Sequence, residues 1–462
     1  MPGVTIGESK AVRALDMKTM ESYLERKYRE VSLLNSCLAS PLDLRKPDSV
    51  GSVIEQKFRL AGALKAERAL KAWAVTETAR DSAHRAKSGG FEFTYGYQRA
   101  DLNVRGPPIY DSLGAANGPV LQETLYTGSG MSAMAALLTA LQRLHSVPEL
   151  LVPEGCYSET LELVESFGQQ FHVLTLEGWR SRLRVSRSTL RVVLLDSSVR
   201  SGFFPPAGIS ADDADLIIFD TTCFWKNSSR IRQVVNWALQ SGLPIALVRS
   251  HAKLDCLGIE YGRLGSVVVA APNRGVLRES PVSVKTLMDQ MRDTVRLFGS
   301  APIPAHFPPF TTLADYESCS RERVAAIMRN TRRMARVLSV ACGEAPCVCV
   351  FQHGLYLTLS PMGNPDIDEA RSLAGALSGE LERNGLPVRH AGSFGFDFVA
   401  IEWFHGSSSP RNLIRVAASD LPPGLADRIA QGIATWWSRG MSVTTRSSRG
   451  SCSTVRPNAN IS

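Results

Sequence analysis

The sequence has no long apolar run and no grouped cysteines. Its longest apolar runs are only as long as a strand, and residues 1–20 lack the apolar segment of a signal peptide, so we expect neither a membrane span nor secretion. The nine cysteines stand singly, apart from Cys347 and Cys349, and the histidines show no metal-ligand spacing. This pattern argues against a disulfide framework and a metal site, and it favours the reducing cytoplasm.

The charge is moderately positive. Lys and Arg number 52 against 44 Asp and Glu, a formal charge of +8. Three of the positive charges lie in residues 441–462, which contain no carboxylate and whose Ser/Thr/Arg-rich composition predicts a disordered tail. No basic-aromatic platform or nucleic-acid motif accompanies the charge, so we expect no nucleic-acid partner and a surface that favours small anionic ligands.

The chain of 462 residues is long enough for two domains and a large core. Residues 1–88 carry apolar side chains at helical spacing, with breaks near Pro41 and Pro47, and predict a helical arm that packs on the body of the protein or on a partner subunit. Residues 88–116 are rich in Gly, aromatic residues and Arg, and we expect them to form a loop.

Strand-like and helical segments alternate from residue 149 onward. The alternation predicts an α/β fold over residues 89–300, in which helices sandwich a mainly parallel sheet. After a proline-rich stretch, residues 301–440 predict a smaller α+β domain that begins with a long helix at 321–338. The strand-like runs of the first domain are 149–152, 171–176, 190–195, 215–219, 244–248 and 266–270, with helices at 158–167 and 230–240.

Two charged side chains stand where neighbouring strands of this sheet are expected to end. Asp220 directly follows the run 215–219, and Lys253 follows the run 244–248 among small residues. Ligands of such sheets bind outside the carboxyl ends of the strands. A lysine that forms a Schiff base and a carboxylate that keeps a pyridine nitrogen protonated suit pyridoxal 5′-phosphate (PLP), so we predict this cofactor.

Other residues near these strand ends have more than one interpretation. Small residues at 127–133 precede a predicted helix, whose first amides suit a phosphate, although a simple helix cap gives the same pattern. We interpret His251 as a structural or supporting histidine, and Cys223 and Cys256 as packing residues without a partner base.

Taken in order, seven motifs resemble those of fold-type-I PLP enzymes, and among these the cystathionine γ-synthase group of Cys/Met metabolism. The resemblance runs from about residue 95 to 420. The motifs are Tyr97-Gln98-Arg99, Ser129-Gly130-Met131-Ser132-Ala133, Gly155-Cys156-Tyr157, Asp220-Thr221-Thr222, Ser250-x-x-Lys253, Ser393-Phe394-Gly395 and Arg415.

The resemblance implies a role for each motif. Lys253 is implied as the Schiff-base lysine and Arg415 as the side chain that grips the substrate α-carboxylate, with Ser393 beside the substrate. Tyr157 is implied to stack on the pyridine ring and to take part in proton transfer. The remaining residues are implied to bind the cofactor: Asp220 at the pyridine nitrogen, Thr222 beside the ring, and Gly130, Met131, Ser250, Tyr97 and Arg99 at the phosphate.

The sequence also departs from this group. The Asn-Pro-Thr that follows Tyr-x-Arg in the group is missing, and Ala252 replaces the threonine before the lysine. Gly262-Arg263-Leu264-Gly265 is similar instead to the Gly-x-Arg-x-Gly of aminotransferases, whose arginine binds phosphate. Arg263 is therefore a second candidate for the phosphate, and we expect a divergent member of the group, one of specialised metabolism rather than a housekeeping enzyme.

The resemblance implies an enzyme that acts on an amino acid through a Cα carbanion. We expect γ-replacement with a small-molecule nucleophile, or γ-elimination, on an activated homoserine or a sulfonium such as S-adenosylmethionine. An aminotransferase is the alternative, and a non-catalytic regulator that uses the same fold is a third. Because Tyr97 and Arg99 complete the neighbouring subunit's site in this group, the resemblance also implies a homodimer or a dimer of dimers.

Overall fold

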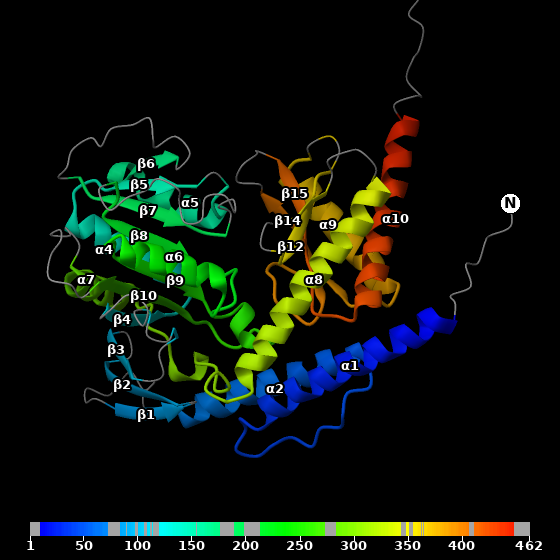
Figure 1. The fold of residues 1–462 in the computed structure, drawn as a ribbon, viewed down its shortest axis with the longest axis horizontal. Helices are drawn as coiled ribbons and strands as arrows, with labels where there is room; N and C mark the ends of the chain where they lie inside the picture. Colours follow the sequence, from blue (N-terminus) through cyan, green and yellow to red (C-terminus); the bar gives the residue numbers. More distant parts are fainter. Residues whose placement is uncertain are drawn as a thin grey trace, which may run out of the picture.

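The computed structural model describes residues 10–72, 84–88, 90–97, 100–105, 109–110, 113, 120–153, 155–175, 189–197, 213–272, 283–342, 348–350, 354–361, 363, 365–405 and 411–447. Its centre is a seven-stranded sheet, here called the large sheet, with strand order β4-β10-β9-β8-β7-β5-β6 (Figure 1). The strands β5 to β9 run parallel, whereas β10 pairs antiparallel with both β4 and β9. This confirms the mainly parallel α/β sheet. The strands are β4 (Val120–Thr127), β5 (Glu149–Val152), β6 (His172–Thr175), β7 (Arg191–Leu195), β8 (Leu216–Asp220), β9 (Ile245–Ser250) and β10 (Gly265–Pro272).

Helices cover both faces of the large sheet. Alternate side chains of the central strands point to opposite faces, so Leu194 and Ile218 pack under α4 (Gly130–Leu144) and α7 (Val284–Phe298). The intervening Phe219 packs on the other face against α6 (Ser229–Gln240). Burial on both faces explains why these strands are continuous apolar runs. A shorter helix, α5 (Ser158–Ser166), follows β5.

A second, five-stranded sheet, here called the small sheet, has the strand order β11-β12-β15-β14-β13. It packs against α8, α9 and α10, and α8 runs diagonally past the small sheet toward α10 (Figure 1). We did not expect β13, and α10 continues to Ser447, so the disordered tail predicted from residue 441 is wrong for residues 441–447. The elements are α8 (Tyr316–Cys342), β11 (Val348–Val350), β12 (Tyr356–Leu359), α9 (Ile367–Arg383), β13 (Val388–His390), β14 (Val399–His405), β15 (Asn412–Ala417) and α10 (Pro423–Ser447).

The N-terminal region holds two helices and a small antiparallel sheet. The helices α1 (Lys10–Asn35) and α2 (Val50–Lys71) lie along one side of the molecule, below α8 in Figure 1. The loop predicted over residues 88–116 is wrong for β2 (Phe91–Tyr97) and β3 (Ala100–Arg105), which pair with β1 (His84–Ser88). These strands form because alternating aromatic residues, such as Phe91 and Phe93, pack against Phe307. Among the helices of the described ranges, none has the length and apolarity that crossing a bilayer requires.

Candidate active site

The ends of β8 and β9 bring four of the predicted residues to one edge of the large sheet. Asp220, the last residue of β8, is paired with Val248, two residues before the end of β9 at Ser250. The Ser250 amide donates to Thr222 Oγ1 at 3.0 Å. Lys253 follows three residues later, in the turn after β9. The juxtaposition predicted from strand order alone is therefore present in the structure.

The N-terminus of α4 packs against the same edge. Ser129 caps the helix, its Oγ accepting from the Ser132 amide at 3.0 Å. A Cβ on Gly130 would lie 2.8 Å from the Ser250 Cβ, so only glycine allows this close approach. The first amides of a helix, here Gly130 and Met131, have no acceptor within the helix and carry the positive end of its dipole. The site thus has an anion-binding end beside Ser250.

Lys253 reaches from the large sheet to a turn of the small-sheet region. Its Nζ donates to Ser393 Oγ and lies 5.7 Å from the centroid of the Phe394 ring. Burial lowers the pKa of Lys253, and the positive charge of Arg415 lowers it further. Ser393 has φ of 104°, a backbone conformation that non-glycine residues rarely adopt. The Ser393 conformation therefore fits a constrained site rather than an ordinary turn.

Arg415 is held by a carboxylate that the sequence analysis missed. Its Nε donates to Glu402 Oε1 at 2.7 Å, its Nη2 donates to the same oxygen, and its guanidinium carbon lies 5.2 Å from the ring centroid of Tyr356 and 4.8 Å from that of Phe404. Glu402 Oε1 also accepts from the Ser393 amide at 2.9 Å. Glu402 therefore links Arg415 to the serine that contacts Lys253. Its partner is set by the β14–β15 register, in which Glu402 faces Arg415, and no local motif signals that pairing.

A second carboxylate missed from the sequence stands beside Asp220. Asp196 follows β7, is buried, and accepts from the Tyr157 amide at 2.9 Å. Tyr157 precedes α5, with 36% of its surface exposed. Burial raises the pKa of Asp220, and the neighbouring Asp196 adds to the rise. A half-buried carboxylate whose pKa is raised is stabilised in its charged form by a cationic partner.

A buried hydrogen-bond network lies behind the lysine turn and explains His251. Its Nδ1 is 2.8 Å from Asp255 Oδ2 and its Nε2 is 2.9 Å from Ser266 Oγ, while Arg249 donates to both Asp255 oxygens at 2.6 and 2.7 Å. Both ring nitrogens are thus engaged, as expected for a structural histidine. The two cysteines also fit packing residues, since burial raises the pKa of Cys223 to about 12 and Cys256 is fully buried.

For three of the predicted phosphate ligands, the described part of the chain shows no contact with the residues at the ends of β8 and β9. Arg263 is exposed, in a turn where Gly262 with φ of +65° packs closely on His306. Tyr97 is the last residue of β2, and its side chain lies outside the described part of the chain. Arg99 lies outside the described residues altogether.

No protein-family model and no curated protein sequence matches the chain. Comparison with solved structures does find matches. Cystathionine γ-synthase from Xanthomonas oryzae pv. oryzae matches with a TM-score of 0.47 and 16% identity, covering 74% of this chain and 89% of that one. MetB from Corynebacterium glutamicum matches with a TM-score of 0.48 and 13% identity, covering 74% and 87%. A Campylobacter jejuni protein proposed to be an O-acetylhomoserine (thiol)-lyase, which contains a pyridoxyl-lysine phosphate, matches with a TM-score of 0.45 and 14% identity, covering 67% and 81%. Each of these names describes that protein and not this chain.

Proposed function

We propose that this chain is a PLP-dependent enzyme that acts on an amino acid, with Lys253 as the residue that holds the cofactor. One observation carries the proposal: a lysine with a lowered pKa, a half-buried carboxylate on the next strand and a tightly packed helix N-terminus lie at one sheet edge. The motif resemblance, which runs through the same residues, supports it.

The residues present fit this cofactor. The amides of Gly130 and Met131 would bind the phosphate together with the Ser250 hydroxyl. Asp220 would pair with the protonated pyridine nitrogen, a cation that would stabilise the charged form of this half-buried carboxylate. Thr222 would lie beside the ring, and Arg263, Tyr97 and Arg99 remain proposed phosphate ligands. When bound, PLP supplies an electron sink for negative charge at Cα.

Lys253 and the side chains around it would each have a separate role in the reaction. A lowered pKa provides the neutral amine that can remove the α-proton and return it to a neighbouring carbon. Of the five N–H donors of Arg415, two serve Glu402, so three are left for a substrate carboxylate. Tyr157 would cover the ring, and Ser393 would keep the lysine at the carbons that exchange protons.

For the reaction, we propose γ-replacement or γ-elimination on an activated homoserine or a sulfonium amino acid. Incubation in D₂O with such substrates should wash deuterium into the α- and β-positions, detected by proton NMR. Exchange at Cα alone, with formation of a keto acid, would indicate transamination instead. No exchange with any γ-substituted amino acid would contradict the proposal.

We also propose a homodimer whose neighbour supplies Tyr97 and Arg99. Mixing inactive Arg99→Ala and Lys253→Ala subunits should restore part of the exchange activity, because some sites in mixed dimers would carry both native residues. Failure of the mixture to regain activity, with subunit exchange verified by mass, would contradict a shared site.

A further inference from the structure

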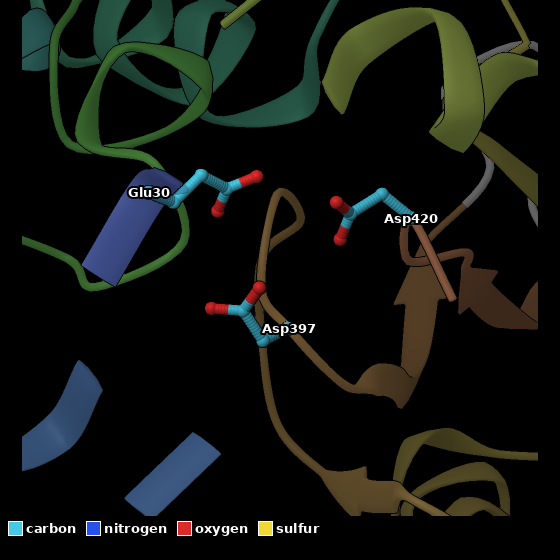
Figure 2. A group of neighbouring side chains, drawn as sticks. All are labelled: Glu30, Asp397 and Asp420. Atoms are coloured by element: carbon cyan, nitrogen blue, oxygen red, sulfur yellow. The ribbon is translucent and has the colours of Figure 1, made fainter. Parts of the chain in front are cut away.

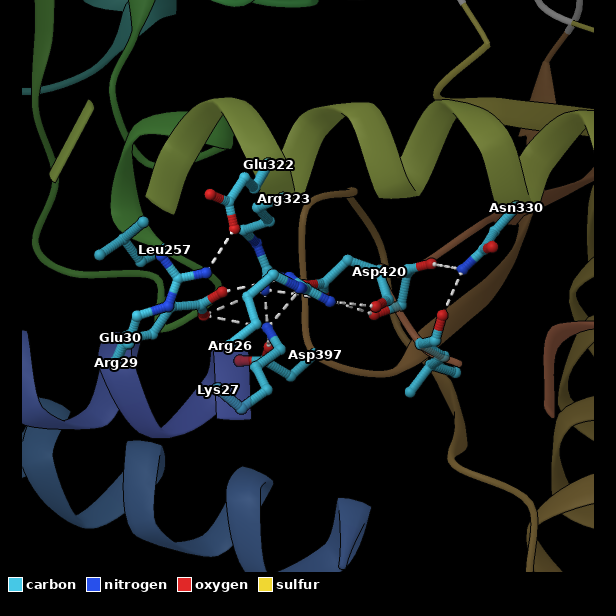
Figure 3. Close-up of polar contacts among 12 residues, drawn as sticks. Arg26, Lys27, Arg29, Glu30, Leu257, Glu322, Arg323, Asn330, Asp397 and Asp420 are labelled. Atoms are coloured by element: carbon cyan, nitrogen blue, oxygen red, sulfur yellow. Dashed lines mark hydrogen bonds and ion pairs between the residues drawn. The ribbon is translucent and has the colours of Figure 1, made fainter. Parts of the chain in front are cut away.

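A buried cluster of charges joins the N-terminal helices to both sheet regions. Three buried carboxylates, Glu30, Asp397 and Asp420, point toward one another (Figure 2). The Lys27 ammonium stands among them, at 2.9, 2.6 and 2.7 Å, in the position that a cation would take. We therefore interpret the group as an ion cluster. Its other cations, several of them drawn in Figure 3, are Arg26, Lys57 and Arg323.

Two of these cations also hold the backbone of the turns that form the candidate site. Lys57 of α2 lies 2.6 Å from Glu30 and 2.9 Å from Asp397, and its Nζ donates to the carbonyl of Leu257, four residues after Lys253. Arg323 of α8 donates to the Gly395 carbonyl at 2.9 Å, two residues after Ser393. The cluster thus binds the turn after Lys253 and the turn after Ser393 at once.

The two turns are in direct contact above the cluster. A Cβ added to Gly395 would lie 3.3 Å from the Lys253 carbonyl oxygen. A Cβ added to Gly258 would lie 2.5 Å from Asp397 Oδ2, and the φ of Gly258 is +87°. Apolar packing follows the same pattern, because α1 and α2 bury Val31 and Leu60 against Leu257 and bury Val53 in the core of the small sheet. The helical arm therefore bridges both halves of the site.

We propose that Lys57 is a positioning residue for Lys253: through the Leu257 carbonyl, the N-terminal arm holds the lysine turn in register with Ser393. The inference rests on the proposed function, because it assigns the arm a role in that same site. If the cluster only stabilised the fold, Lys57 and Lys27 would be equivalent, and neither would affect the position of Lys253.

The cluster offers a matched comparison. Its four cations face three carboxylates, so Lys57→Met and Lys27→Met each leave three of each sign. Both lysines are buried and both contact Glu30 and Asp397, but Lys57 also donates to Leu257. Lys71→Met, on the exposed face of α2, controls for the loss of a charge from that helix.

The test measures how fast the apoprotein captures PLP as a function of pH, which reports the neutral fraction of Lys253. The largest influences on the pKa of Lys253 are burial, Arg415, Glu260, Cys223 and Glu159, none of which belongs to the cluster. A shift in Lys57→Met would therefore report movement of the lysine, and we expect the midpoint to rise by about one pH unit as Lys253 approaches its ordinary pKa. We expect Lys57→Arg to restore most of the native midpoint, and Lys27→Met and Lys71→Met to leave it unchanged.

Equal midpoints in Lys57→Met and the wild type, or equal shifts in Lys57→Met and Lys27→Met, would overturn the inference. If Lys57→Met does not fold, Lys57→Gln, which is one bond shorter than lysine, replaces it under the same criteria. If the wild type captures no PLP at any pH, the proposed function fails instead, so the two failures are distinguishable.

Discussion

The candidate site and the ion cluster contact the same two turns, but the pKa values of their carboxylates are shifted in opposite directions. In the site, burial dominates: the pKa of Lys253 is lowered and that of Asp220 is raised, so both charged forms are disfavoured. The carboxylates of the cluster differ, because opposite charges overcome burial and hold the pKa values of Asp397 and Asp420 well below their usual range. Burial alone therefore does not determine whether a carboxylate is protonated, because the charges beside it also shift its pKa.

The largest expected effect comes from removing the reactive group of the site. Lys253→Ala should lower α-proton exchange by roughly 10³-fold or more, because it removes both the cofactor attachment and the base. Stability of the apoprotein should not fall, since the site disfavours the lysine charge. Exchange rates and urea unfolding would measure both, and a folded variant with wild-type exchange would contradict the assignment.

Removing a carboxylate of the ion cluster should instead lower the stability of the fold. Asp420→Asn leaves four cations, three of them buried, with two carboxylates, and breaking a buried pair in this way costs about 3–5 kcal/mol of unfolding free energy. Urea unfolding of the purified variant would measure the loss. Asp427→Asn, which breaks a more exposed pair with Arg333, is the matched control and should cost under about 1 kcal/mol. Similar losses in the two variants would refute the contrast.

The cluster should also determine behaviour in acid. Because the folded-state pKa values of Asp397, Asp420 and Glu30 are lowered, their contribution to stability is present above their ordinary values near pH 4 and is lost as pH falls through and below that range. The unfolding free energy should therefore drop from about pH 4 downward, and the gap between wild type and Asp420→Asn should narrow there. A gap that stays constant to pH 2 would contradict this linkage.

The smallest expected effect comes from changing Arg415 or its partner Glu402, which act on the pKa of Lys253. Arg415→Leu removes a positive neighbour, so the pKa of Lys253 should rise and the midpoint of PLP capture should move up, by under about one pH unit. Glu402→Gln should move it slightly down, because the Arg415 charge then loses its carboxylate partner. Shifts of the same sign in both variants would show that Glu402 does not act through Arg415.

The sequence predicts those features that a local pattern encodes. The strands β5, β7 and β8 lie within about one residue of their predicted bounds, because strands buried on both faces are unbroken apolar runs. The placement of Asp220 and Lys253 after neighbouring strands is predicted by the rule that parallel strands end at one edge. The strand β2 was missed, although its residues alternate, because glycine and arginine around it indicated a loop.

Features that depend on distant partners could not be predicted. Lys27 and Asp397 are 370 residues apart in the chain, and nothing local to α1 indicates that this lysine is buried. Glu402 is similar, since an acidic residue in a strand usually points into solvent. Only the register of β14 with β15 turns it toward Arg415.

The most direct test of the account is chemical labelling of the native protein. The purified chain would be supplied with PLP, reduced with borohydride, digested and mapped by mass spectrometry, with Lys253→Ala as the control. The account predicts a yellow protein and one pyridoxyl group, located on Lys253 and missing from the control. A colourless protein, or a label spread over surface lysines and unchanged in Lys253→Ala, would contradict it.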